Sequence, residues 1–221
     1  MRLHFFLTSN RQAVPFSYQH FLTGALHKWL DANRLHDRLS LYSLSWLDGG
    51  RMRAGALEFS GGARFFISLH DESLVEPIVN SALADPEVCC GMHVSRIEQQ
   101  PTPRFGTRHT FKVGSPVLAK SKEVDGKVKH YLFSDPEADA TLTATLRHKL
   151  DKAGLGAPHN HATVSFDKTY RNPKIKLVTI KNIHNRATIC PVTVEGTPEA
   201  VAFAWNVGVG NGTGSGFGSL L

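Results

Sequence analysis

The sequence predicts an α+β fold made of two tandem ferredoxin-like units, each a split β-α-β arrangement, with a glycine-rich loop at the C-terminal end. Three observations lead to this prediction. Segments with strand and helix periodicity follow one another in the same order twice along the chain. A proline-rich segment, Gln99–Gly106, lies between the two copies. With 221 residues, the chain is long enough for two small domains and too short for a third. We therefore expect domains at residues 1–100 and 101–221.

The first half is predicted to contain two helices and five strands. Apolar residues at helical spacing begin after Ser17, which is available as a cap, and a second helix begins at Asp71 and ends before Pro86. Asp48-Gly49-Gly50 is a turn sequence between strand-like runs. The expected helices are Ser17–Asn33 and Asp71–Ala84, and the expected strands are Leu3–Thr8, Leu39–Leu47, Arg53–Phe59, Arg64–Leu69 and Val88–Glu98.

The second half repeats this order. Asp-Pro-Glu at its start and Gly154 at its end delimit one helix, and Thr197-Pro198-Glu199 opens another. A strand region comes first, with a hairpin as one option for its end. The expected helices are Asp135–Ala153 and one that starts at Thr197, and the expected strands are His109–Ala119, Val128–Phe133, Thr163–Asp167, Lys174–Lys181 and Ala187–Val194.

The glycine-rich segment has glycine at every second position of residues 208–218. Its backbone amides can approach an anion closely because no Cβ intervenes. A P-loop is excluded because Gly-Lys-Ser/Thr is absent, and no register fits G-x-G-x-x-G. A flexible tail is the alternative, although a linker would hardly carry Val209 and Phe217 symmetrically near its two ends.

Composition excludes some classes of protein. With 41% hydrophobic and 20% charged residues, the chain is of the ordinary globular kind and not disordered. No apolar run approaches the ~20 residues of a membrane span, and Met1–Asn10 lacks the apolar length of a signal peptide. Three cysteines, of which Cys89 and Cys90 are neighbours, are typical of a reducing compartment. We expect a cytoplasmic protein with no membrane contact.

The positive charge is concentrated in the second half. The chain carries a net charge of +6. Residues 1–100 have 9 Lys and Arg against 10 Asp and Glu, a net charge of −1, whereas residues 101–221 have 16 against 9, a net charge of +7. An anionic partner such as nucleic acid and a merely solubilising surface are both compatible with this distribution.

Both ends of the chain carry motifs: Gly208-Val209-Gly210 followed by Gly216-Phe217-Gly218 near the C-terminal end, and a helix, a Leu-His and a strand within residues 15–43. The first resembles the glycine-rich loop, and the second the first helix and next strand, of the CRISPR repeat-processing endoribonucleases of the RAMP superfamily. The resemblance implies two tandem ferredoxin-like domains, in agreement with the duplicated order. It also implies CRISPR repeat RNA as partner, and cleavage without metal or other cofactor that leaves a 2′,3′-cyclic phosphate and a 5′-hydroxyl.

The resemblance also implies catalytic residues. His36 falls where the family commonly has its catalytic histidine, His27 where some members have a tyrosine, and Arg38 near where some have a lysine. Metal-free cleavage needs a base for the 2′-hydroxyl, an acid for the leaving 5′-oxygen and a group that stabilises the charged phosphorane. Two imidazoles and a guanidinium meet this need, and which histidine is the base stays open. Asp31, one turn after His27, is placed to orient it.

We expect RNA to bind mainly along the second half. In the run Lys174 to Leu177, alternation places the lysines on one face of a strand and the apolar residues on the other, which predicts a half-buried strand with a basic outer face. Tyr170 is a candidate for stacking on a base or for packing. Lys28, in the first helix, either contacts phosphate or is simply solvated. The expected RNA contacts are Lys28, Lys168, Arg171, Lys174, Lys176, Lys181, Arg186, Gly208, Gly210, Gly216, Phe217 and Gly218.

Other functions remain open at this level. A non-catalytic RNA-binding subunit of a CRISPR effector complex is the main alternative, and a nucleotide-binding protein is a more distant one. Effector-complex subunits and a second copy of the chain are further partners that the resemblance allows. A metal site made of His159, His161 and Cys190 is conceivable, but no ligand spacing of the CxxC or HExxH kind supports it, so no metal is expected.

Overall fold

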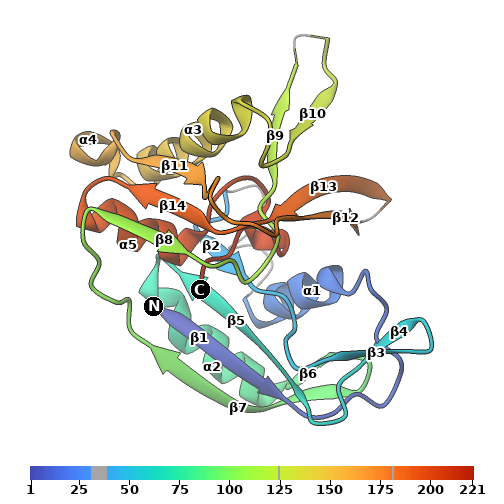
Figure 1. The fold of residues 1–221 in the computed structure, drawn as a ribbon. Coiled ribbons are helices and arrows are strands. Elements are labelled where there is room, and N and C mark those ends of the chain that lie inside the picture. Colours follow the sequence, from blue (N-terminus) through green and yellow to red (C-terminus); the bar gives the residue numbers. More distant parts are fainter. Residues whose placement is uncertain (31–38, 124, 181) are drawn as a thin grey trace.

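The computed structural model describes residues 1–30, 39–123, 125–180 and 182–221 (Figure 1). Its first half contains one antiparallel sheet in the order β2-β5-β1-β7-β6, with helices α1 and α2. The order β2-β5-β1-β7 is that of a ferredoxin-like unit. The elements of this half are β1 (Arg2–Leu7), α1 (Gln19–Trp29), β2 (Tyr42–Leu44), β3 (Arg51–Arg53), β4 (Ala56–Glu58), β5 (Ala63–Leu69), the 3-10 turn η2 (Glu72–Leu74), α2 (Val75–Ala84), β6 (Glu87–Cys89) and β7 (Met92–Gln100).

The second half repeats the plan with a smaller sheet, in the order β11-β14-β8. The last residues of the chain continue it, because Leu220 bridges to Val113 just beyond β8. Two further hairpins, β9–β10 and β12–β13, project from this half (Figure 1). The elements are β8 (Arg108–Phe111), β9 (Ala119–Lys122), β10 (Val128–Tyr131), α3 (Glu137–Lys152), α4 (Gly156–His159), β11 (Thr163–Phe166), β12 (Lys174–Ile180), β13 (Ile183–Ile189), β14 (Val192–Glu195), α5 (Pro198–Val207) and the 3-10 turn η3 (Thr213–Ser215).

This architecture confirms the predicted fold class, an α+β protein with two ferredoxin-like units in tandem. The alternation in β1 explains how the first core forms. Leu3, Phe5 and Leu7 are buried on one face of the strand, where Phe5 stacks on Trp29 of α1 with ring centroids 5.1 Å apart. None of the described helices is long and apolar enough to cross a bilayer.

Several predicted elements are shorter or divided. The strands predicted at 53–59 and 88–98 each contain a tight turn, at Ala54-Gly55 and at Cys90-Gly91, where all four residues have positive φ. The strand predicted at 187–194 is divided at Cys190-Pro191. The segment before this point is part of β13 and pairs with β12, and the segment after it is β14, which pairs with β11 and β8. Proline has no amide hydrogen to continue a ladder, so it suits this change of sheet.

The first helix and the strand after it are also shorter than predicted. Tyr18, and not Ser17, is the cap residue of α1, and no side chain caps this end. The helix ends at Trp29, because Leu30 has extended backbone angles. The strand predicted at 39–47 has ladder pairing only over Tyr42–Leu44.

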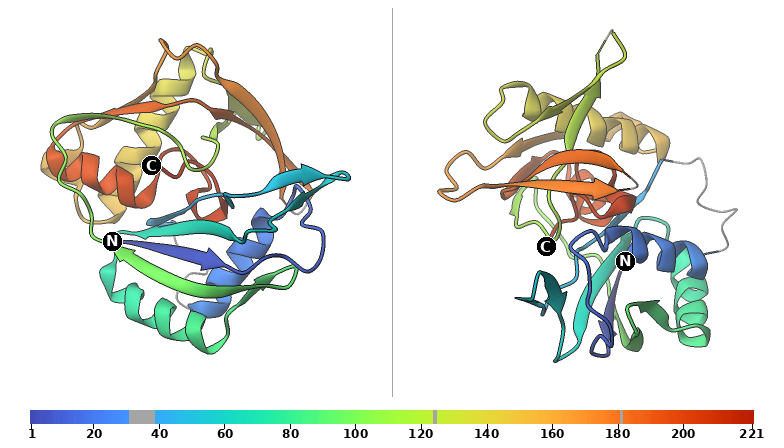
Figure 2. Two further views of the ribbon diagram at one scale, coloured as in Figure 1. Left: turned by 60° about the horizontal axis from the view of Figure 1, so that its bottom comes forward. Right: turned by 90° about the vertical axis from the view of Figure 1, so that its right-hand side faces the viewer.

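Helix α5 lies between the two sheets, and both views of Figure 2 place this end of the chain between the two lobes. Seven of its ten residues are buried, as expected for a helix covered on both sides. His70, just after β5, meets Phe203 edge-on with ring centroids 4.8 Å apart. The N-terminal amine at Met1 donates to Asn206 Oδ1 at 3.2 Å. Packing and hydrogen bonds therefore join the two halves along this helix.

Arg2 is a buried cation at this junction. Its side chain lies between the rings of Phe66 and Trp205, with the guanidinium carbon 3.9 and 3.7 Å from the two ring centroids. It donates to Ser68 Oγ at 2.7 Å and to the Leu220 carbonyl at 2.6 Å. Burial lowers the pKa of Arg2 to about 9. One side chain thus joins β1, β5, α5 and the C-terminal end of the chain.

We expect Arg2→Ala to lower the free energy of unfolding by about 2–4 kcal/mol, because two aromatic rings lose their shared partner and a cavity opens between the halves. Urea denaturation followed by tryptophan fluorescence measures this change. Arg51→Ala, at an exposed position of β3, is the matched control and should stay within about 0.5 kcal/mol of the unsubstituted protein. Equal midpoints for the two variants would contradict a joining role for Arg2.

Candidate functional site

One face of α1 is turned toward the glycine-rich loop. Gln19 is buried and packs against Gly216. Thr23, one turn later, has its Oγ1 3.5 Å from the Gly214 carbonyl oxygen. His27 follows after another turn, so it belongs to the same stripe of the helix, and it is half-buried. The helix therefore presents one imidazole on the side of the loop.

The glycine-rich loop is packed inside the protein, which excludes the flexible tail. Five of its glycines, at 208, 210, 212, 216 and 218, have positive φ. A Cβ on Gly218 would lie 1.9 Å from the Val209 carbonyl oxygen, and a Cβ on Gly210 would lie 2.4 Å from that of Leu118. Phe217 is buried against Leu118 and the hairpin β12–β13. The tight packing needs glycine because only hydrogen atoms fit between these chain segments.

Hydrogen bonds hold the loop to both halves. Val209 N donates to the Gly218 carbonyl at 2.9 Å and closes the loop on itself. Trp46 Nε1 donates to the Gly216 carbonyl at 2.8 Å. The exposed or half-buried rim of the loop comprises Asn211, Gly212 and Ser215. The five residues of the loop that we predicted as RNA contacts are buried, so contact with RNA at this loop stays a prediction and would be made at the rim.

A buried lysine that the sequence reasoning missed anchors the loop from the other side. Lys149 of α3 is only 2% exposed. Its ammonium donates to the Val207 carbonyl at 3.0 Å and to Thr213 Oγ1 at 2.9 Å, and Thr213 in turn donates to the Tyr42 carbonyl. Burial lowers the pKa of Lys149 to about 7. Its place on the apolar face of a predicted helix was the available signal, because Leu142, Leu146 and Leu150 belong to that face.

Of the three predicted catalytic residues, the structure places His27 alone. His36 and Arg38 lie outside the described residues, as do Asp31 and the predicted RNA contact Lys181. Lys28 is turned to α2 and the strand after it, where it forms an ion pair with Asp85 at 2.9 Å and donates to the Glu87 carbonyl. Its ammonium is therefore engaged within the protein.

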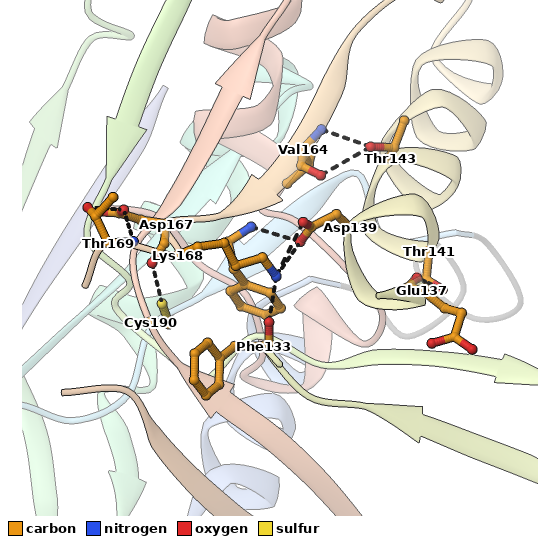
Figure 3. A network of polar contacts seen from close by, with 11 residues as sticks. Phe133, Glu137, Asp139, Thr141, Thr143, Val164, Asp167, Lys168, Thr169 and Cys190 are labelled. Carbon is orange, nitrogen blue, oxygen red and sulfur yellow. Dashed lines mark hydrogen bonds and ion pairs between the residues drawn. The ribbon is translucent and has the colours of Figure 1, made fainter. Parts of the chain in front are cut away.

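Lys168 is engaged in a similar way (Figure 3). Its ammonium donates to the Phe133 carbonyl and forms an ion pair with Asp139 at 3.3 Å. The Asp139 carboxylate also accepts the Phe166 amide at 3.0 Å and so ties α3 to β11. Arg171, three residues later, is exposed. The structure gives Lys168 a role in joining the loop after β11 to α3.

The prediction of a basic outer face on the strand that starts at Lys174 is wrong. In the hairpin register, Lys174 and Lys176 share the face of Val178, which is buried against Leu118 and Phe217. Ile175 and Leu177 point to the opposite side, where they are 52% and 65% exposed. In the described structure β12 pairs only with β13, so the lysine side chains can extend past this edge into water.

The open face of the first sheet carries a cavity that the sequence reasoning did not find. It has a volume of about 660 Å³, and its aromatic and charged lining comes from the first half, while Val113, Gly114 and Leu221 of the second half complete it. Arg64 pairs with Asp48 there, and this hydrogen bond lowers the pKa of the Asp48 carboxyl. The outward positions of β1 were the available signal, since His4 and Phe6 alternate with buried residues. The lining includes His4, Phe6, Trp46, Asp48, Arg64 and Phe66.

Within the described ranges, no three His, Cys, Asp or Glu side chains are grouped as metal ligands. The set of His159, His161 and Cys190 is therefore not brought together. His159 Nδ1 instead lies 2.6 Å from Thr197 Oγ1, and Cys190 is buried.

Two ferredoxin-like units in tandem, with a C-terminal glycine-rich loop packed on the first helix, define a RAMP-type protein. A family model, CRISPR associated protein Cas6, C-terminal, matches residues 98–220. The match covers more than half of the chain, which therefore belongs to the Cas6 family of CRISPR-associated proteins. The resemblance seen at the two ends of the sequence is thereby confirmed.

Similar solved structures cover the whole chain. A protein described as the product of a Cas6-related gene from Pyrococcus furiosus has 18% identity and a TM-score of 0.87 over 100% of this chain and 97% of that one. A RAMP protein described as binding different RNA substrates has 18% identity and a TM-score of 0.85, over 100% and 98%. A Cas6 product complex has 16% identity and a TM-score of 0.66, over 100% and 98%. At such identities the likeness shows the fold. Among curated sequences, none matches the chain significantly.

We expect Gly218→Ala to destabilise the protein by at least about 2 kcal/mol, because the new Cβ would meet the Val209 carbonyl oxygen and because φ is +60°. Thermal unfolding measured by circular dichroism tests this. Gly106→Ala is the control, since no heavy atom lies within 4 Å of its Cβ position. A melting temperature equal to that of the control variant would show that the loop is not packed as described.

We expect the stability difference between the unsubstituted protein and Lys149→Met to depend on pH. The folded pKa of Lys149 is lowered from 10.5 to about 7, so between these values the unfolded chain binds more protons and the stability of the unsubstituted protein rises with pH. The slope of the difference should approach about 1.4 kcal/mol per pH unit above pH 7 and vanish below pH 6. Urea denaturation of both proteins from pH 5.5 to 9 measures it. Parallel curves over this range would contradict a buried, titrating ammonium.

Proposed function

We propose that this protein is a metal-independent endoribonuclease that cleaves CRISPR precursor RNA within its repeats. Attack by the 2′-hydroxyl next to the scissile phosphate would leave a 2′,3′-cyclic phosphate and a 5′-hydroxyl. Membership of the Cas6 family supports the choice of CRISPR RNA as substrate. The observation that carries the proposal is the position of His27 on the stripe of α1 that faces the glycine-rich loop.

The chemistry assigns three tasks to the protein. A neutral imidazole accepts the proton of the 2′-hydroxyl, an imidazolium donates a proton to the leaving 5′-oxygen, and a cation holds the phosphorane oxygens. In the proposal, His27 and His36 share the two proton transfers and Arg38 holds the phosphate. Such a set works near neutral pH because the unperturbed pKa of histidine is about 6.5.

The proposal divides the work between two domains. Residues 1–100 would carry the catalytic side chains, and residues 101–221 would bind RNA through the basic hairpin and the rim of the glycine-rich loop. Lys174, Lys176 and Arg186 are exposed on that hairpin, and Arg171 is exposed just before it, which supports a contact with phosphates. The fold of a RAMP protein described as binding different RNA substrates extends over this whole chain.

The test is a single-turnover cleavage assay in EDTA with repeat RNA from the genome that encodes the protein. We expect one cut in the normal RNA and none in an RNA with a 2′-deoxy nucleotide at the cleavage site. His27→Ala and His36→Ala should each lower the rate by roughly 10²–10⁴-fold, the usual contribution of a general acid or base. His20→Ala, at an exposed position of the same helix, is the control and should keep the rate.

Three outcomes would decide against parts of the proposal. Wild-type rates for both His27→Ala and His36→Ala would refute the catalytic assignment. Cleavage of the 2′-deoxy RNA would refute attack by the 2′-hydroxyl. Tight binding of both RNAs without any cut would favour the alternative function, a non-catalytic RNA-binding subunit of a CRISPR effector complex.

A further inference from the structure

The hairpins β9–β10 and β12–β13 meet beside the glycine-rich loop (Figure 1). In the β9–β10 register, Lys120 is opposite His130 and Lys122 is opposite Val128, so these four side chains share one face. That face is turned to Asn185 of β13, because Lys120 Nζ donates to Asn185 Oδ1 at 3.4 Å. The sequence reasoning assigned no function to the first hairpin.

Asn185 is a buried polar side chain at the meeting point. It is 5% exposed, and its Nδ2 donates to the Ile183 carbonyl at 3.2 Å. A hydrogen bond also joins it to His130. The other ring nitrogen, His130 Nε2, is buried and has no hydrogen-bond partner in the described part of the chain. A buried polar atom without a partner is uncommon and costly.

Two positive charges, Lys120 and Arg186, act on His130. Burial, the nearby Lys120 and then Arg186 lower the pKa of His130, and only the hydrogen bond with Asn185 acts in the opposite direction. Neither Lys120 nor Arg186 forms an ion pair with a carboxylate among the described residues. Lys127 and Lys129 of the same hairpin do, with Asp125 and Glu137. The meeting point of the hairpins therefore has an uncompensated positive charge.

We propose that Lys120, Asn185 and His130, together with Arg186 on the adjoining exposed face of β13, form a binding site for backbone phosphates of the substrate RNA. The inference rests on the proposed function, which already includes Arg186 as an RNA contact, and extends that contact region to the hairpin β9–β10. The cluster is joined to the loop, because the Lys120 amide donates to Asn211 Oδ1 at 2.9 Å and the Asn211 amide donates to the Leu118 carbonyl at 2.8 Å. An RNA strand that leaves the rim of the loop would meet these cations next.

The chemistry of the site favours phosphate over a base. Lysine and arginine bind phosphate oxygens through charge-assisted hydrogen bonds, and an amide adds a neutral donor. A bound phosphate would also offset the mutual repulsion of the three cationic groups when His130 takes up a proton. The site would therefore contribute affinity without reading sequence, and its contribution would fall with salt.

The test compares two double variants that remove the same charge. K120Q/R186Q removes the cluster, whereas K127Q/K129Q removes two lysines of the same hairpin that are paired with carboxylates. Fluorescence anisotropy measures binding of a repeat RNA with a 2′-deoxy nucleotide at the cleavage site, from 50 to 300 mM salt. We expect K120Q/R186Q to lose about tenfold or more in affinity and to reduce the salt slope by roughly 1–2, while K127Q/K129Q stays within about twofold.

A second measurement uses His130 as a reporter in the unsubstituted protein. Its imidazole signals, assigned by comparison with His130→Gln, are titrated by NMR with and without the RNA. We expect the pKa of His130 to rise when RNA is bound, because phosphate would compensate Lys120 and Arg186. This readout decides the question even if K120Q/R186Q fails to fold.

The outcomes separate this inference from the proposed function. If the unsubstituted protein does not bind the RNA, the proposed function fails. If it binds but K120Q/R186Q has the affinity and salt slope of K127Q/K129Q, the phosphate site is refuted while the proposed function stands. An unchanged pKa of His130 in the RNA complex would refute the site in the same way.

Discussion

The close contact between backbone segments of the glycine-rich loop is the constraint on which the rest of the structure depends. Residues 209 and 218 touch across the base of the loop, and the segment before β9 touches Gly210. With the loop in this position, Trp46 of the first half donates a hydrogen bond to the Gly216 carbonyl, and Phe217 packs against the hairpin β12–β13. Helix α1, the hairpin β12–β13 and α3 all pack against one element of the chain. The loop therefore positions the catalytic candidate and the basic hairpin relative to each other.

Among the described residues, two cations are buried near this loop, Arg2 and Lys149, and their partners there are aromatic rings, carbonyls and hydroxyls. Arg2 lies between two aromatic rings and donates to a carbonyl at the end of the chain. Lys149 donates to the carbonyl of Val207, the last residue of α5, where the helix dipole is negative. These hydrogen bonds fix the positions of the two side chains, because each donor has a defined acceptor. Desolvation of the charge lowers the pKa values of both Arg2 and Lys149.

The sequence was sufficient to predict the fold class, because periodicity records which face of each element is buried. The turns at Ala54 and Cys90 could not be predicted in this way, since neither residue is typical of positive φ. Alternation also could not show which face of β12 is packed. It separated Lys174 and Lys176 from Ile175 and Leu177 correctly. It could not show that Val178, on the lysine side, packs against Phe217, while Ile175 and Leu177 are exposed.

The same limit applies to the candidate site. The position of His27 on a stripe of α1 follows from helical spacing, whereas the packing of that stripe on the loop depends on contacts such as that of Thr23 with Gly214, nearly two hundred positions apart. The burial of Lys149 could not be predicted from hydropathy, because hydropathy does not show that the Val207 carbonyl and the Thr213 hydroxyl accept hydrogen bonds from its ammonium. The cluster at Asn185 joins residues of two hairpins that are 65 positions apart, and a pattern within either hairpin could not reveal it.

The position of the glycine-rich loop in the chain has a consequence for how the protein is made. Ribosomes synthesise residues 208–220 after every segment that this loop contacts. The first core draws only on residues 3–94, so it can form while translation continues. The surfaces of α1, β2 and β9 that later receive the loop stay uncovered during that time. A nascent chain would thus hold the first core before the glycine-rich loop packs on it, and during this interval the surfaces that receive the loop would be accessible to chaperones.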